Sequence, residues 1–389
     1  MQRAALFTGP RAAGAGRVGV ALATVAAYGV ACLVHLLVAG MLIGGLLLVV
    51  VGWETVVQPV VGLVLLVGAV HLRPRPDRLD PELPTLRRED APALYAWVDD
   101  VADAVGVRRV DVVQVSADFA LRVSGYGLRR RRRLELGLPL WLTLTPQQRV
   151  AAVAHELGHF TARDIRRGAL IGAALSSSAG REEVTARGPG RASAGSLSAS
   201  PVSRHADEMA TASARFNARG RTADLALWLP RLVVQGANRL LMRLSLPNAR
   251  RTEFQADAVA ARVASTEAAV SALRDRLLAG DMNAEVHRLA VTARTLRPRG
   301  AARSTDRDLW ADVAAHAAAL PRHTGDAFPA EEGGLGLPSV GSRIARLRLG
   351  ADQPAVLTLG AGRADAIEDE LREPRGLLAK KVIQDCVHA

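Results

Sequence analysis

An apolar run near the N-terminus limits most strongly what this chain can fold into. From Val18 to Trp53 nearly every residue is apolar or small, and after Glu54 a second apolar stretch continues from Thr55 to Leu72. A helix that crosses a membrane needs about 20 apolar residues, so the first stretch is longer than one span requires and the second is barely sufficient. We therefore expect a transmembrane hairpin over residues 18–72, and hence a multi-pass membrane protein.

The charges around these stretches predict the orientation of the hairpin. The turn carries only Glu54, whereas basic residues flank both ends, namely Arg3, Arg11, Arg17, Arg73, Arg75 and Arg78. Because positively charged segments stay on the cytoplasmic side of a membrane, we expect both ends of the hairpin and the rest of the chain to face the cytoplasm at the plasma membrane. A break at Gly44–Gly45 would make three spans, and this alternative stays open.

Composition excludes several classes of protein. The 389 residues are 49% hydrophobic, which excludes a chain that is disordered throughout. Two cysteines, Cys32 and Cys386, exclude a disulfide scaffold and suit a reducing compartment. The 50 basic and 38 acidic residues give a net charge of +12, which favours contact with anionic lipid head groups. The run Arg129–Arg133 has no interleaved aromatic residues, so we interpret it as a solvated hairpin tip and expect no nucleic-acid partner.

The chain after the hairpin is expected to be mainly α-helical with a small β-sheet. Thr145, Pro146 and Gln148 form the pattern of a capping box and predict the start of a helix. Apolar spacing predicts other helices over residues 90–105, 249–263, 266–278 and 308–320. Short β-type runs are found at Val110–Val115, Phe119–Val123 and Leu134–Leu138.

Changes in composition along the chain suggest its divisions. The expected order is a cytoplasmic segment 1–17, the hairpin 18–72, a proline-rich linker 73–89, a domain 90–350 that contains a flexible insert 180–220, and a C-terminal tail 351–389.

The sequence His155-Glu156-Leu157-Gly158-His159 falls within the helix expected after Thr145. Residues four apart on a helix share one face, so both imidazoles can face one metal ion. Two histidines and one carboxylate leave a fourth position open on zinc, where a water is activated for attack on a carbonyl. Glu156 is placed to take the proton of that water. The pentapeptide is therefore a candidate hydrolytic centre with one zinc ion per chain.

A carboxylate must complete this set of ligands. Glu253 and Asp257 are four residues apart on an expected helix, so one can bind the metal while the other holds the far nitrogen of a ligand histidine. After the two histidines, we favour a ligand role for this pair over an ordinary solvated acidic pair. Asp164 is a rival candidate that lies too near on the same helix, and Glu182 and Glu183 are rivals within the flexible insert.

Three segments of the chain resemble the HtpX-like and CAAX-prenyl-protease-like family of membrane zinc metallopeptidases. They are Ala151–Asp164 (AAVAHELGHFTARD), Arg250–Ala260 (RRTEFQADAVA) and Ser342–Leu347 (SRIARL). The resemblance extends over roughly residues 18–350. It implies a gluzincin-type zinc metallopeptidase domain.

The resemblance also implies a role for each matching residue. His155, His159 and Glu253 would be the zinc ligands, Glu156 the general base and Asp257 the carboxylate behind the ligands. The implied substrates are membrane or membrane-associated polypeptides that lie extended along an edge strand, from either Phe119–Val123 or Leu134–Leu138. The expected activity is that of a membrane-anchored zinc endopeptidase.

Two departures from the family pattern motivate an alternative. Family members commonly carry His-Pro before the Arg-Ile segment, where the histidine is thought to stabilise the transition state, and this chain has Leu337-Pro338. His323, His316 or Arg343 are candidates to replace it. A common asparagine of the early β region is also replaced, near Asp118. The alternative is a catalytically weak relative that binds zinc and acts as a membrane scaffold or regulator.

Overall fold

The computed structural model describes residues 10–51, 55–72, 77–127, 129, 131–160, 236, 239–240, 243–295, 308–323 and 337–385. These residues fall into two units, of which the first contains residues 1–75 and 167–248 and the second contains residues 76–166 and 249–389. The insert 180–220 and the rival ligands Asp164, Glu182 and Glu183 lie outside the described residues.

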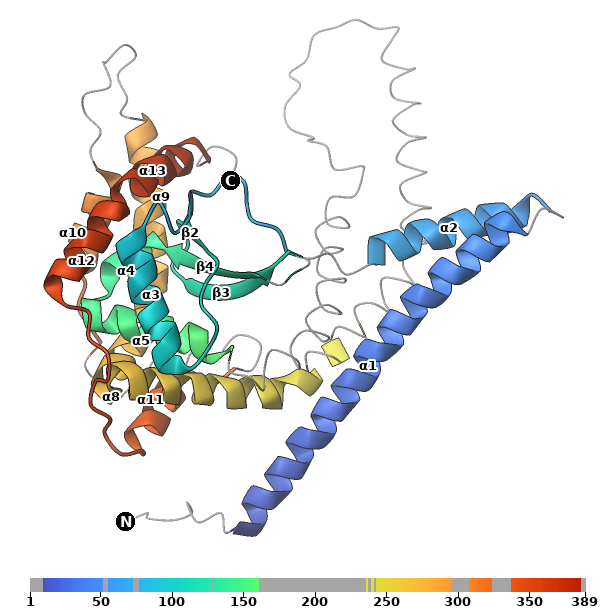
Figure 1. The fold of residues 1–389 in the computed structure, drawn as a ribbon, viewed down its shortest axis with the longest axis horizontal. Coiled ribbons are helices and arrows are strands. Elements are labelled where there is room, and N and C mark those ends of the chain that lie inside the picture. Colours follow the sequence, from blue (N-terminus) through green and yellow to red (C-terminus); the bar gives the residue numbers. More distant parts are fainter. Residues whose placement is uncertain are drawn as a thin grey trace, which may run out of the picture. The chain divides into compact units, whose positions relative to one another are not determined.

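The first unit contains two apolar helices that pack against each other (Figure 1). Helix α1 spans Pro10–Val50 and helix α2 spans Val57–Leu72. Helix α1 continues without a break through Gly44–Gly45, so the alternative of three spans is wrong. Within the described residues, Val25–Val50 is the one stretch long and apolar enough to cross a membrane. The 16 residues of α2 extend about 24 Å at 1.5 Å per residue, less than the hydrocarbon thickness of about 30 Å.

Small residues bring α1 and α2 together. A Cβ atom added to Gly45 would lie 2.8 Å from the backbone oxygen of Gly62, and one added to Gly62 would lie 2.7 Å from the backbone oxygen of Gly45. Such glycine contacts are typical of helix pairs in membranes, because they allow two backbones to approach closely. Many of the large apolar side chains on both helices are instead exposed.

The second unit is built around a four-stranded sheet. Its strands are β1 (Thr85–Leu86), β2 (Val112–Ser116), β3 (Leu121–Tyr126) and β4 (Arg131–Gly137). The spatial order is β1-β2-β4-β3, with β2 and β4 parallel and the other two pairs antiparallel. Strand β4 is therefore internal and β3 lies at an edge. Two runs were expected as possible edge strands. Phe119–Val123 overlaps β3 and lies at the edge, whereas Leu134–Leu138 overlaps the internal strand β4.

One face of the sheet forms the core. Val113 and Val115 of β2 and Leu134 and Leu136 of β4 are buried in the main hydrophobic cluster. Among the helices that join them in the cluster are α3 (Pro92–Val105), α4 (Leu138–Thr143) and α5 (Pro146–Gly158) (Figure 1). The period of two along each strand separates these apolar residues from polar ones such as Gln114 on the opposite face.

The expected start of α5 is confirmed. The Thr145 hydroxyl accepts a hydrogen bond from the Gln148 backbone N–H, and the Gln148 side chain accepts one from the Thr145 backbone N–H. This reciprocal pair satisfies two backbone donors that the helix leaves without partners. It fixes the first turn of the helix whose last turn carries the histidines.

The remaining helices of the second unit extend to the C-terminal end. After the helical residues 243–264 they are α8 (Thr266–Asp275), the short 3₁₀ helix η1 (Arg276–Leu278), α9 (Ala279–Thr295), α10 (Leu309–Ala319), α11 (Val340–Arg348), α12 (Ala361–Glu370) and α13 (Arg372–Asp385).

Two segments at the expected boundaries are part of this unit. Strand β1 lies within the segment expected as a linker. Ile367, Leu371 and Leu378 of the expected tail are buried in the main hydrophobic cluster. Apolar residues at helical spacing give α12 and α13 a face that packs on the core, so the segment after residue 350 is structural.

The interpretation of Arg129–Arg133 as a solvated tip is wrong for its second half, because β4 begins at Arg131. Arg132 is buried, with its guanidinium carbon 4.9 Å from the centre of the Phe160 ring. Arg133 donates hydrogen bonds to side-chain oxygens of Ser124 and Gln114. These arginines are held by partners on the protein, which a charge count does not reveal.

Candidate metal centre

The last turn of α5 presents two imidazoles side by side. The Nε2 atoms of His155 and His159 lie 3.3 Å apart, and the two ring planes are nearly perpendicular. His155 is buried and His159 is half-buried. The four-residue spacing therefore places both nitrogens on one face of the helix, as the sequence predicts.

Glu253 meets these imidazoles from the helix over residues 243–264. One carboxylate oxygen lies 3.6 Å from His155 Nε2 and the other lies 3.6 Å from His159 Nε2. Among the described residues, these three form the one group of histidine, cysteine and acidic side chains whose ligand atoms, all within 4.8 Å of one another, could hold a metal ion.

Gly158 allows the two helices to come this close. A Cβ atom on Gly158 would lie 3.2 Å from the Cα atom of Ala256 and 3.3 Å from the Cβ atom of Val259. These distances are tighter than ordinary contacts, so a larger residue would push the helix that carries Glu253 away from α5. The glycine inside the pentapeptide therefore has a packing role.

Asp257 fixes the orientation of the first histidine. Its carboxylate lies 2.9 Å from His155 Nδ1, which leaves the Nε2 atom of His155 facing Glu253 and His159. Burial lowers the pKa of His155 to about 3, although the hydrogen bond to Asp257 opposes this shift. The imidazole is thus neutral near pH 7, the form that binds a metal.

Arg343 on α11 lies behind the same carboxylate. Its guanidinium donates to both oxygens of Asp257, at 2.6 and 2.8 Å, and lies 3.2 Å from an oxygen of Glu253. Burial alone would raise the pKa of Asp257, but hydrogen bonds from Arg343 and His155 hold it well below its usual range. Arg343 therefore lies near the centre, but two of its nitrogens are occupied by Asp257.

Glu156 lies beside the histidines and has a cationic partner. Its carboxylate accepts a hydrogen bond of 3.2 Å from Nη2 of Arg276, the first residue of η1. Burial raises the pKa of Glu156, while the charge of Arg276 opposes the rise. Arg276 was not a candidate in the sequence, because it is 120 positions from Glu156 and belongs to no recognised motif.

The two other candidates for transition-state stabilisation take no part in the metal group. His316, near the end of α10, has its Nδ1 atom 4.0 Å from a carboxylate oxygen of Glu285 on α9. His323 is half-buried in the segment after α10. Leu337, which stands where the family pattern has histidine, is 37% exposed and offers no polar side-chain atom.

The chemistry of the donors fits zinc. Two neutral imidazole nitrogens and one carboxylate are the ligand types that zinc binds in catalytic sites, where a fourth position stays open. The hydrogen bond from His155 Nδ1 to Asp257 is the support that metal-binding histidines usually receive. His155, His159 and Glu253 would hold the ion.

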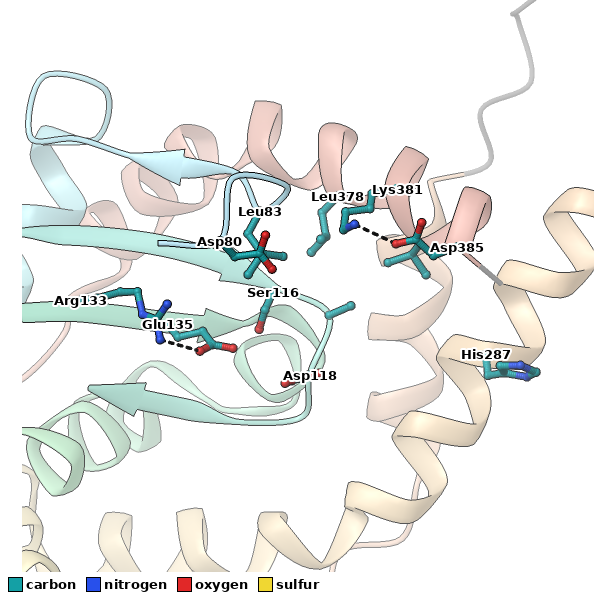
Figure 2. A pocket seen from close by; sticks show the side chains of 12 residues that line it. Asp80, Leu83, Ser116, Asp118, Arg133, Glu135, His287, Leu378, Lys381 and Asp385 are labelled. Carbon is teal, nitrogen blue, oxygen red and sulfur yellow. Dashed lines mark ion pairs between the residues drawn. The ribbon is translucent and has the colours of Figure 1, made fainter. Parts of the chain in front are cut away.

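A separate pocket lies on the polar face of the sheet (Figure 2). It has a volume of about 650 Å³ and contains none of the residues of the metal centre. Its lining includes Asp118, near which the asparagine of the family pattern is replaced. The other lining residues are Asp80, Leu83, Ser116, Ala117, Arg133, Glu135, His287, Leu378, Lys381, Val382 and Asp385.

A helix with two histidines one turn apart, a glutamate between them and a carboxylate from a second helix together define a metallopeptidase centre. The sequence model of peptidase family M48 matches residues 93–288, about half of the chain. The chain therefore belongs to peptidase family M48, a family of zinc metallopeptidases. This confirms the expected family and the mainly helical fold with a small sheet. No curated protein and no solved structure matches the chain in the corresponding searches.

Proposed function

We propose that this chain is a membrane-anchored zinc endopeptidase that cleaves membrane or membrane-associated polypeptides. The observation that carries the proposal is the convergence of His155, His159 and Glu253 with Glu156 beside them. Membership of family M48 supports the reaction class, which is hydrolysis of peptide bonds.

Each residue around the centre has a separate role in the proposed hydrolysis. Bound zinc would supply Lewis acidity to the attacking water and the peptide carbonyl. Glu156 accepts a proton from the water as its oxygen forms a bond to the carbonyl carbon, and then delivers that proton to the leaving nitrogen as the C–N bond breaks. Burial raises the basicity of this carboxylate, which suits a general base. Asp257 keeps His155 in the tautomer that presents Nε2.

Strand β3 is the proposed binding strand for the substrate. It pairs with β4 on one side, and the order of the sheet leaves its other side as an edge. Strand β3 also contacts α5, the helix that carries both histidines. A polypeptide that pairs with this edge would lie extended beside the metal centre, with backbone hydrogen bonds that require no particular side chains.

The N-terminal helices support attachment to a membrane. Helix α1 contains an apolar stretch of 26 residues, and many of its large side chains are exposed. We propose that α1 and α2 form a multi-pass anchor at the plasma membrane, with the second unit on the cytoplasmic side as the flanking arginines predict. Substrates near the bilayer would then be concentrated close to the metal centre.

A comparison of wild type with Glu156→Gln tests the proposal. Both proteins, purified in detergent, should contain one zinc ion per chain, and only wild type should cleave casein or itself. Glu267→Gln, which changes an exposed glutamate at the start of α8, is the matched control and should behave as wild type. Absence of zinc from wild type, or equal cleavage by Glu156→Gln, would contradict the proposal.

Zinc in both proteins with cleavage by neither would favour the alternative of a zinc-binding scaffold. The observation behind that alternative is Leu337, which provides no hydrogen-bond donor where the family pattern has histidine.

A further inference from the structure

Arg276 is a cation next to the proposed general base. Its Nη2 atom lies 3.2 Å from a Glu156 carboxylate oxygen, and its side chain is 31% exposed, compared with 13% for Glu156. Among the described contacts of Glu156, this is the one ion pair. The guanidinium has five N–H donors, and only one of its nitrogens contacts Glu156. It therefore retains donors that can contact a bound substrate.

The other arginine of the centre is held differently. Arg343 is 8% exposed, and both oxygens of Asp257 accept hydrogen bonds from it. Moving it toward a substrate would leave a buried carboxylate without its partner, which is strongly unfavourable. Arg276 is more exposed and belongs to a short 3₁₀ helix that follows α8. Of these two cations, Arg276 is thus the one able to reach a substrate.

We propose that Arg276 is a catalytic residue that donates a hydrogen bond to the carbonyl oxygen of the scissile peptide as negative charge develops on it. This assignment rests on the proposed peptidase function. When the water oxygen bonds to the carbonyl carbon, the C=O π electrons move to the carbonyl oxygen and one water proton moves to Glu156. When the C=O bond forms again, the C–N bond breaks and the nitrogen takes the proton from Glu156.

The ion pair with Glu156 positions the Arg276 side chain before the substrate binds. In the resting protein the charge of Glu156 keeps the guanidinium beside the site of attack. Protonation of Glu156 during attack removes that negative charge at the same moment as a new one develops on the carbonyl oxygen. The preferred partner of Arg276 therefore changes from the base to the substrate, within a partly buried site where such interactions are strong.

The first test compares Arg276→Gln and Arg276→Lys with wild type in the full-length, zinc-loaded protein. Arg288→Gln is the matched control, because Arg288 is an exposed arginine paired with Glu285 on its own helix. We expect Arg276→Gln to lower kcat by about 10²- to 10³-fold, the usual effect of losing one oxyanion donor. The KM value should change less than threefold, zinc content should stay the same, and Arg276→Lys should recover part of the rate.

Two further measurements separate this role from a structural one. Affinity for a phosphinic peptide, whose charged oxygens resemble the tetrahedral state, should fall at least tenfold in Arg276→Gln by calorimetry, while Arg288→Gln binds as wild type. Free guanidinium at millimolar concentration should restore part of the rate of Arg276→Ala, which a misfolded variant would not allow.

Several outcomes would overturn the assignment. A kcat of Arg276→Gln within threefold of wild type, unchanged affinity for the phosphinic peptide, or no rescue by guanidinium would each contradict it. If Glu156→Gln is inactive and Arg276→Gln is fully active, the assignment alone fails. If wild type binds zinc but cleaves no peptide, or if Glu156→Gln cleaves as wild type does, the proposed function fails with it.

Discussion

The Asp257 carboxylate lies 2.9 Å from Nδ1 of His155 and binds the Arg343 guanidinium through both oxygens. One buried acid thus connects a proposed ligand histidine with a buried arginine that comes from α11. The metal centre is in this way tied to a helix outside the residues that match family M48.

The connection predicts the effect of Asp257→Asn. The amide removes the charge that holds the His155 tautomer and leaves Arg343 with a weaker partner. We expect zinc affinity to fall by about 10- to 100-fold, measured by competition with a chelator. Asp281→Asn, at an exposed position of α9, serves as the control and should not change the affinity. Equal zinc affinity of Asp257→Asn and wild type would show that Asp257 does not support the ligand.

Removal of zinc should abolish cleavage and leave the fold largely intact. The centre offers three protein ligands, fewer than the four of a structural zinc site. The main hydrophobic cluster is formed by α3, α5, the sheet and the C-terminal helices and does not depend on a metal. Far-UV circular dichroism before and after treatment with a chelator checks this expectation, with readdition of zinc as the control for reversible loss of cleavage. Loss of most of the helical signal would contradict it.

The ion pairs of Glu368 on α12 predict how the stability of the folded protein depends on pH. The Glu368 carboxylate accepts hydrogen bonds from Arg149, at 2.7 Å, from Trp141, at 3.0 Å, and from Arg375. Burial raises the pKa of Glu368, but Arg149 and Arg375 outweigh it and bring the net pKa below the ordinary value of 4.5. The unfolded chain then binds a proton first as the pH falls, so this stabilisation is fully present above about pH 5 and is lost at lower pH.

Replacement of Glu368 by Gln tests this dependence. Loss of the charged hydrogen bonds should lower the free energy of unfolding at pH 7 by about 2 kcal/mol. The variant should also lose less stability than wild type between pH 5 and pH 3, as measured by denaturant unfolding. Glu373→Gln, at an exposed position of α13, is the control. An identical pH dependence in wild type and Glu368→Gln would contradict the prediction.

Gly44 and Gly45 of α1 provide a matched pair of alanine variants that tests how α1 packs against α2. A Cβ atom at Gly45 would lie 2.8 Å from the backbone oxygen of Gly62, whereas one at Gly44 meets nothing within 4 Å. Gly45→Ala should therefore separate α1 from α2 and lower the temperature at which the detergent-solubilised protein aggregates. Gly44→Ala should not lower it. The same decrease in both variants would mean that the close contact at Gly45 does not stabilise the hairpin.

Local spacing in the sequence was sufficient for the parts of the site that one helix forms. The capping box at Thr145 and the four-residue spacing of His155 and His159 depend on contacts within a few residues. The same applies to Glu253 and Asp257, which share one helical face. A helix with a known period presents such residues in the same relation wherever it packs.

The family resemblance correctly indicated the peptidase class, and the apolar run near the N-terminus indicated a helix able to span a membrane. The order of the strands did not follow from the sequence. Either Phe119–Val123 or Leu134–Leu138 could have been the edge, because both have similar apolar patterns, and strand pairing depends on contacts between distant residues.

Tertiary structure alone identified Arg276 as a cation of the centre and decided that Arg343, rather than His316 or His323, enters it. Arg343 is 188 positions from His155, and Arg276 is 120 positions from Glu156. Arg343 was a candidate because it lies in the segment SRIARL, but nothing in the local sequence distinguishes Arg276 from the other basic residues, 50 in all. The partners of Arg343 and Arg276 are set by how α11 and η1 pack against α8, which itself contacts α5. Burial then makes a charged group retain the partner that this packing supplies.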